Sequence, residues 1–163
     1  MGIPTLILAQ TAADDVNIDF TADIDSTYDE YMFVCTDINP SQTAQFGFQV
    51  NVAGESGFNE TITSTVFDGL HTEDDTTSFA YSTGEDQAQG TAFQNLGNAY
   101  DSAADSSGAV ILHLFSPSNT TYVKHFYART NHVKAGDASQ FAFAAGYINA
   151  TGAVDDISFK VYP

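Results

Sequence analysis

Basic residues are almost missing from this chain: lysine and arginine together number 4, against 21 acids, which gives a formal net charge of -17. None of the four occurs before Lys124, and the others are Arg129, Lys134 and Lys160. A protein that binds nucleic acid needs a basic surface, and an anionic membrane repels an acidic one. The composition therefore predicts no nucleic-acid partner and no membrane partner. It favours a soluble protein whose copies repel one another in a salty medium.

Cysteine occurs once, as Cys35, and tryptophan is absent, so no disulfide can form within the chain. Cys35 lies in the apolar run YMFVC, where a buried and unreactive thiol is expected. The segment 1–10, MGIPTLILAQ, lacks the basic residues that begin a signal peptide and is too short to cross a bilayer. We predict that this segment forms the first strand of a protein made in the cytoplasm.

Apolar and polar residues alternate along several segments with a period of two, which is typical of half-buried strands. The alternation is clearest over 46–52 and 157–161, and turn-forming residues separate such segments. Two further runs, 31–35 and 110–115, are apolar on both faces and are predicted to be central strands. Together these patterns predict an all-β fold: an antiparallel β-sandwich, jelly-roll-like, of about nine or ten strands, in a single domain over 1–163.

The stretch 82–108 departs from this pattern because its residues are small, polar and acidic. We predict a long polar connection here, of a length at which loops are often functional. Two alternatives stay open for its structure: a short helix over 86–96, or an arm that reaches a neighbouring subunit.

Histidines and carboxylates supply the candidates for a metal site. If 110–116 and 122–128 pair about Asn119, then His113 falls opposite His125. No third ligand follows at a fixed spacing, so packing is the favoured role of this pair. Asp23 and Asp25 begin an acidic cluster that could bind calcium adventitiously, although a solvated surface is the favoured interpretation. No catalytic or cofactor-binding motif occurs, so neither an enzyme nor a cofactor is predicted.

A carbohydrate-binding module is an alternative function, because β-sandwiches often bind sugars through aromatic side chains. The absence of tryptophan weakens this alternative. The candidate aromatic residues are Tyr28, Tyr31, Tyr81, Tyr100, Tyr122 and Tyr127. A glycosidase that uses the acidic clusters is a more distant alternative, since nothing separates a proton-donating carboxyl from its partner.

An ordered series of segments covers nearly the whole chain: GIPTLI at 2–7, FTADIDSTYDEYMFV at 20–34, SGFNETITST at 56–65, DQAQGTAFQNLGN at 86–98, LHLFSPSNTTYVKHFYA at 112–128 and AGYINATGAVDDISFK at 145–160. This series resembles a family of small proteins of marine tailed bacteriophages, cyanophages among them, that are described as virion structural or tail-fibre-like. The resemblance brings no catalytic residues with it.

The resemblance implies a non-catalytic structural role on the exterior of the virion, after synthesis in the cytoplasm of a bacterial host. The length of the chain favours a capsid decoration protein, knob-like or cement-like, that contacts the major capsid protein. A tail-fibre or collar accessory protein is the alternative. A homo-oligomer is expected, with a trimer as one form. The interface candidates are Lys124, Arg129 and Lys134, and we expect Lys124 and Arg129 to form salt bridges between subunits.

Overall fold

The protein is an all-β chain of eleven strands in the computed structural model, which describes residues 3–163. No helix long and apolar enough to cross a membrane occurs in this part of the chain. Every strand pair is antiparallel, so the expected antiparallel all-β fold is confirmed, with slightly more strands than the nine or ten predicted. The jelly-roll connectivity stays a prediction. The strands are β1 (Asn17–Phe20), β2 (Glu30–Cys35), β3 (Ala44–Val52), β4 (Ile62–Thr72), β5 (Thr77–Tyr81), β6 (Ala88–Gly90), β7 (Gln94–Tyr100), β8 (Gly108–Phe115), β9 (Lys124–Lys134), β10 (Ala138–Ile148) and β11 (Val154–Tyr162).

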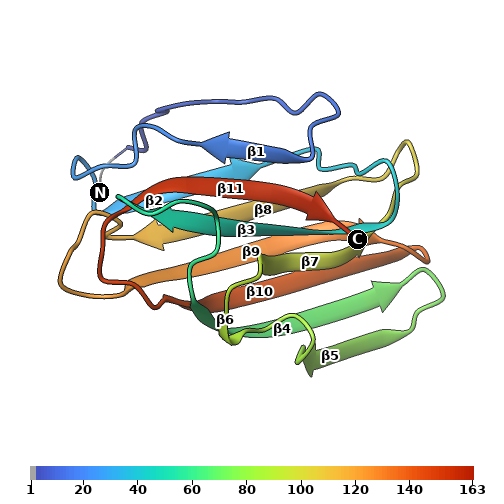
Figure 1. Cartoon of the computed structure of the whole chain (residues 1–163). Coiled ribbons are helices and arrows are strands. Elements are labelled where there is room, and N and C mark those ends of the chain that lie inside the picture. Colours follow the sequence, from blue (N-terminus) through green and yellow to red (C-terminus); the bar gives the residue numbers. More distant parts are fainter. Residues whose placement is uncertain (1–2) are drawn as a thin grey trace.

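The strands lie in two layers that face each other (Figure 1). The smaller layer has the order β1-β11-β3-β7, and the larger layer has the order β2-β8-β9-β10-β4-β5, with β6 paired to β4. A single bridge between Tyr100 of β7 and Lys134 of β9 joins the two layers. Between the layers, Phe48 of β3 and Phe126 of β9 meet with their ring centroids 5.0 Å apart. The core is therefore the space enclosed by the two layers.

The alternation in the sequence corresponds to burial in the larger layer. In β8, Val110, Leu112 and Leu114 are at most 1% exposed, whereas the residues between them point away from the core. The same alternation runs along β9 and β10. Successive side chains of a strand point to opposite faces, so each of these strands contributes one face to the core and one to the outside.

The expectations for 82–108 need correction. The segment holds two strands, β6 and β7, and no helix over 86–96. β7 pairs with β3, where Phe46 lies opposite Gly97 and Phe48 lies opposite Gln94. The polar side chains of Gln94 and Asn95 are buried there. The sequence of a strand with buried amide side chains resembles that of a polar loop. The alternation of apolar and polar residues therefore did not predict β7.

The N-terminal segment does not form the expected first strand. Residues 3–13, here called the N-terminal arm, make no backbone-to-backbone hydrogen bond and lie outside both layers. The arm runs beside β1, where the Gln10 side-chain amide donates to the Asp19 carbonyl at 2.8 Å (Figure 1). Ile3 is 92% exposed and Leu6 82% exposed, so an apolar segment stays in contact with water.

The hairpin of β8 and β9 has a different register from the one predicted. His113 lies opposite Tyr127, and His125 lies opposite Tyr147 of β10. The observed register centres the hairpin one residue beyond Asn119, and this displaces each pair by two positions. Asn119 caps the connection, because its side-chain oxygen accepts the N–H groups of Thr121 and Tyr122 at 2.7 and 2.8 Å. The two histidines therefore share a face without facing each other.

Candidate functional site

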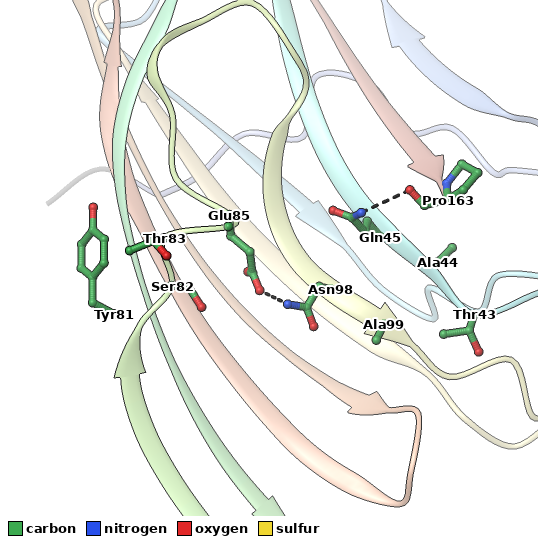
Figure 2. A pocket seen from close by; sticks show the side chains of 11 residues that line it. Thr43, Ala44, Gln45, Tyr81, Ser82, Thr83, Glu85, Asn98, Ala99 and Pro163 are labelled. Atoms are coloured by element: carbon green, nitrogen blue, oxygen red, sulfur yellow. Dashed lines mark hydrogen bonds between the residues drawn. The ribbon is translucent and has the colours of Figure 1, made fainter.

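A polar pocket opens where the loop after β5 meets β3 and β7 (Figure 2). Its volume is about 630 Å³. No sequence motif predicted a pocket at this position. Figure 2 shows Glu85, from the loop after β5, and Asn98, from β7, pointing toward each other. The lining residues are Thr43, Ala44, Gln45, Tyr81, Ser82, Thr83, Gly84, Glu85, Asn98, Ala99 and Pro163.

Glu85 is the chemically unusual residue of this pocket. It is 7% exposed, and its Oε1 accepts a hydrogen bond from the Asn98 side-chain amide. Its Oε2 has no hydrogen-bond partner among the described residues 3–163. Burial, followed by the charge of Asp68, raises the pKa of this carboxyl to about 7. The carboxyl therefore titrates near neutral pH, because a buried charge without full hydrogen bonding is costly.

The network behind Glu85 continues to Lys134. The Lys134 ammonium donates to the side-chain oxygens of Asn98 and Gln140, the latter at 3.1 Å. Burial lowers the pKa of Lys134, while the nearby charge of Glu85 opposes that change. Asn98 thus links an acid and a base through one amide group. Lys134 was an interface candidate, but its ammonium is engaged within the chain.

A stacked pair lies below this network. The rings of Tyr100 and His132 are 3.9 Å apart, and His132 Nε2 lies 2.9 Å from the Asn98 carbonyl. Burial lowers the pKa of His132 to about 4, so the imidazole is neutral and donates this hydrogen bond. Within residues 3–163 the Tyr100 hydroxyl and His132 Nδ1 find no hydrogen-bond partner. Both side chains are buried, at 1% and 2% exposure, so they lie beneath the pocket and do not line it.

Lys124, the second interface candidate, is part of the interior. It is 1% exposed, and its ammonium donates to three backbone carbonyls: Tyr122 at 3.3 Å, Ala150 at 3.2 Å, and Gly152. Burial is the main cause that lowers its pKa. The expected salt bridge from Lys124 to another subunit is wrong, because the side chain points into the core and ties two loops together.

Arg129, the third interface candidate, is exposed and lies near the middle of the larger layer. Its neighbours across the strands are Ile111 on β8 and Phe143 on β10. The ion pairs within residues 3–163 are His71–Asp75 and Glu30–His113, so Arg129 has no acidic partner in this part of the chain. Of the three predicted interface residues, it is the one whose charge is available.

The metal candidates do not come together. His113 Nδ1 lies 2.5 Å from Glu30 Oε1, and its ring stacks on Tyr127 at 4.5 Å. Asp25 accepts hydrogen bonds from the Thr27 N–H and the Tyr31 hydroxyl within its own turn, which holds its pKa below the usual value. Asp23 lies in the same turn with φ of 67°. Residues 3–163 contain no group of three or more histidine, cysteine or acidic side chains arranged to hold a metal ion.

An apolar surface on the larger layer was missed by the sequence analysis. Its outward side chains, here called the outer face, include many large apolar groups, and only Glu30 among the outward residues of these six strands carries a carboxylate. Ile111, Phe115 and Tyr127 lie here rather than in the core. The most exposed members are Met32, Val34, Phe67, Phe79, Tyr81, Ile111, Val133 and Phe141.

One register row shows how continuous the outer face is. It crosses all six strands of the larger layer, and its members are Val34, Ile111, Arg129, Phe143, Phe67 and Tyr81. Aromatic rings connect neighbouring rows: Tyr127 stacks on Phe143 at 6.1 Å, and Phe67 contacts Tyr81 at 5.2 Å. An exposed apolar surface of this extent is typical of an interaction site. The signal in the sequence was the pair of runs that are apolar on both faces.

Comparison with protein-family models, curated proteins and solved structures finds no match for this chain.

Proposed function

We propose that this chain is a structural subunit of a bacteriophage particle, carried on the outside of the capsid as a decoration protein. It has no catalytic role in this proposal, and its partners are the major capsid protein and other copies of itself. The observation that carries the proposal is the contrast between an acidic chain and two apolar surfaces with few charges: the outer face, where Glu30 and Arg129 are the charged residues, and the N-terminal arm, which has none. Such surfaces in a protein of net charge -17 favour assembly over a free monomer.

The acidity supports an exterior position. Many copies of an acidic domain on a particle repel neighbouring particles and keep them dispersed. The β-sandwich supports the same role, because its two layers form a rigid body that needs no partner to complete its core. Residues 3–163 form no elongated shaft of the kind that a fibre uses. The capsid surface is therefore favoured over the tail, and the tail-fibre or collar position is the alternative.

The location can be tested by cryo-electron microscopy of the intact particle that encodes the chain. Density for this sandwich on the outer capsid, in contact with the major capsid protein, is the expected result. Density on the tail or collar would replace decoration by the alternative position. A particle without this chain, confirmed by mass spectrometry of purified particles, would overturn the structural proposal.

Carbohydrate binding is a second candidate function, favoured by one observation. Tyr81 is 41% exposed and borders the pocket that also presents Glu85, Asn98 and hydroxyl side chains. An aromatic ring beside such groups is a common arrangement for a sugar. Of the six tyrosines considered, Tyr31 and Tyr100 are buried and cannot serve. Glycan-array binding that is lost in Tyr81→Ala and retained in Tyr122→Ala, which changes a 70% exposed tyrosine outside the pocket, would support this function.

A further inference from the structure

We infer that the N-terminal arm of one copy binds the outer face of another copy. The inference deepens the self-association expected of the proposed function, and it can hold wherever the protein is located. Both surfaces belong to the same chain, both are apolar, and neither is covered within it. The charge, the size and the positions of the two surfaces in the fold support this contact.

Charge selects these two surfaces as the places where copies can meet. Residues 3–13 carry no charged side chain, although the chain has 21 acids. The outer face has one acid, Glu30, whose carboxylate is already paired with His113. Contacts between other parts of two copies bring carboxylates together without compensating bases, which is unfavourable. The arm and the outer face avoid this repulsion.

The remaining charges are complementary. Arg129 is the one cation of the outer face without a partner in residues 3–163. The first carboxylates after the arm are Asp14 and Asp15, both exposed. An arm that crosses the outer face can bring one of them to the Arg129 guanidinium, and a charge-assisted pair fixes the direction of the arm. The apolar residues Ile3, Leu6, Ile7 and Leu8 then cover the aromatic rows.

The dimensions of the two surfaces agree. An extended segment of the length of 3–13 spans up to about 36 Å at about 3.3 Å per residue. The six strands of the larger layer, spaced by about 4.8 Å, present a face roughly 24 Å wide. The arm is therefore long enough to cross the outer face completely. The four large aliphatic side chains on the arm lose apolar area to the contact when they cover the outer face, which favours binding.

The positions of the two surfaces favour another copy as the acceptor. The arm leaves the fold at β1, in the smaller layer, and lies along that strand (Figure 1). The outer face belongs to the larger layer and points away from the smaller one. A contact between two different surfaces is heterologous, and its repetition closes a ring when the rotation allows it. A closed ring such as the expected trimer is one assembly that this contact can build.

Light scattering on the purified full chain is the first test. A mass of at least twice 17.4 kDa is expected. Leu6→Asp should raise the dissociation constant at least about 100-fold. Tyr122→Asp is the matched control, because Tyr122 is 70% exposed but lies off the outer face. A full chain that is monomeric at high concentration would overturn the inference. An oligomer that persists unchanged after deletion of 3–8 would overturn it as well.

Disulfide trapping tests the contact itself. Leu6→Cys protein mixed with Ile111→Cys protein should give a disulfide between copies, whereas Leu6→Cys mixed with Ser56→Cys should not. Native Cys35 does not interfere, because burial raises its pKa to about 12 and the thiol stays protonated at neutral pH. A chain that carries both Leu6→Cys and Ile111→Cys gives the opposite test. If it forms this disulfide within itself and keeps a monomeric mass, the inference is overturned and the arm covers the outer face of its own chain. Particle reconstruction tests location separately, so the two proposals can fail independently.

Discussion

Burial of Glu85 leads to a definite expectation for the pH dependence of stability. Burial, more than the nearby charge of Asp68, raises the pKa of its carboxyl from 4.5 to about 7 in the folded protein. Between these values the folded chain binds a proton that the unfolded chain has released. The free energy of unfolding therefore falls as the pH rises from 4.5 to about 7, and the loss is complete above that range. Below this range both states are protonated and burial of the group carries no charge penalty.

The size of the effect follows from the same two values. A pKa that changes from 4.5 to about 7 corresponds to about 3 kcal/mol. This figure is an upper limit, because the carboxyl borders an open pocket where water screens the charge. We expect roughly 1–2 kcal/mol of stability to be lost across neutral pH through this residue.

Glu85→Gln removes the titration while it retains the shape of the side chain. Urea unfolding of both proteins from about pH 5 to about pH 8 should show little difference at the acidic end. At the alkaline end the variant should be more stable by roughly 1–2 kcal/mol. Glu73→Gln, at an exposed position, serves as the control and should show no such pH-dependent difference. A difference between Glu85→Gln and the parent that stays constant across the range would refute the reasoning.

Three further predictions follow from burial and exposure. Lys124→Met should lower the free energy of unfolding by roughly 2–4 kcal/mol, because three carbonyls lose a charged donor. Arg129→Met, at an exposed position, should change it by less than about 0.5 kcal/mol. Chemical denaturation of both variants measures the two values, and equal losses would contradict the placement of both side chains. Phe48→Ala should destabilise the fold by about 3–5 kcal/mol, since the ring is 0% exposed against Phe126, and a smaller loss in thermal unfolding would argue against a closed core. Chymotrypsin should cut first after Leu6 or Leu8, as intact mass would show, and a first cut within a strand would contradict an accessible arm in the free chain.

The parts of the fold that could be predicted are those where one face is apolar and buried. Val110, Leu112 and Leu114 alternate with outward residues, and their burial agrees with the pattern. β7 could not be found in this way, because Gln94 and Asn95 are buried polar residues. The Gln94 side-chain nitrogen donates to local carbonyl groups, such as that of Glu85 at 3.1 Å. Alternation of hydrophobicity predicts a strand only where the buried side chains are apolar.

The runs that are apolar on both faces were interpreted as central strands, and this was half right. β8 lies inside the larger layer, but β2 lies at its edge. Both strands are apolar on their second face because that face belongs to the exposed outer face, where Met32 is 45% and Val34 56% exposed. The sequence reports that a side chain is apolar. It does not report whether the covering group comes from the same chain or from another one.

Most of the few basic residues are engaged within the fold. Lys124 holds two loops, Lys134 belongs to the network of Glu85, and Lys160 lies 5.5 Å from the centre of the Phe93 ring. Because these bases serve the fold, the surface available to a partner is more acidic than the net charge suggests. A positive strip for association therefore does not exist. If copies associate as proposed, their contacts are expected where carboxylates are missing, and the arm and the outer face meet that condition, with Arg129 as the single cation left to orient them.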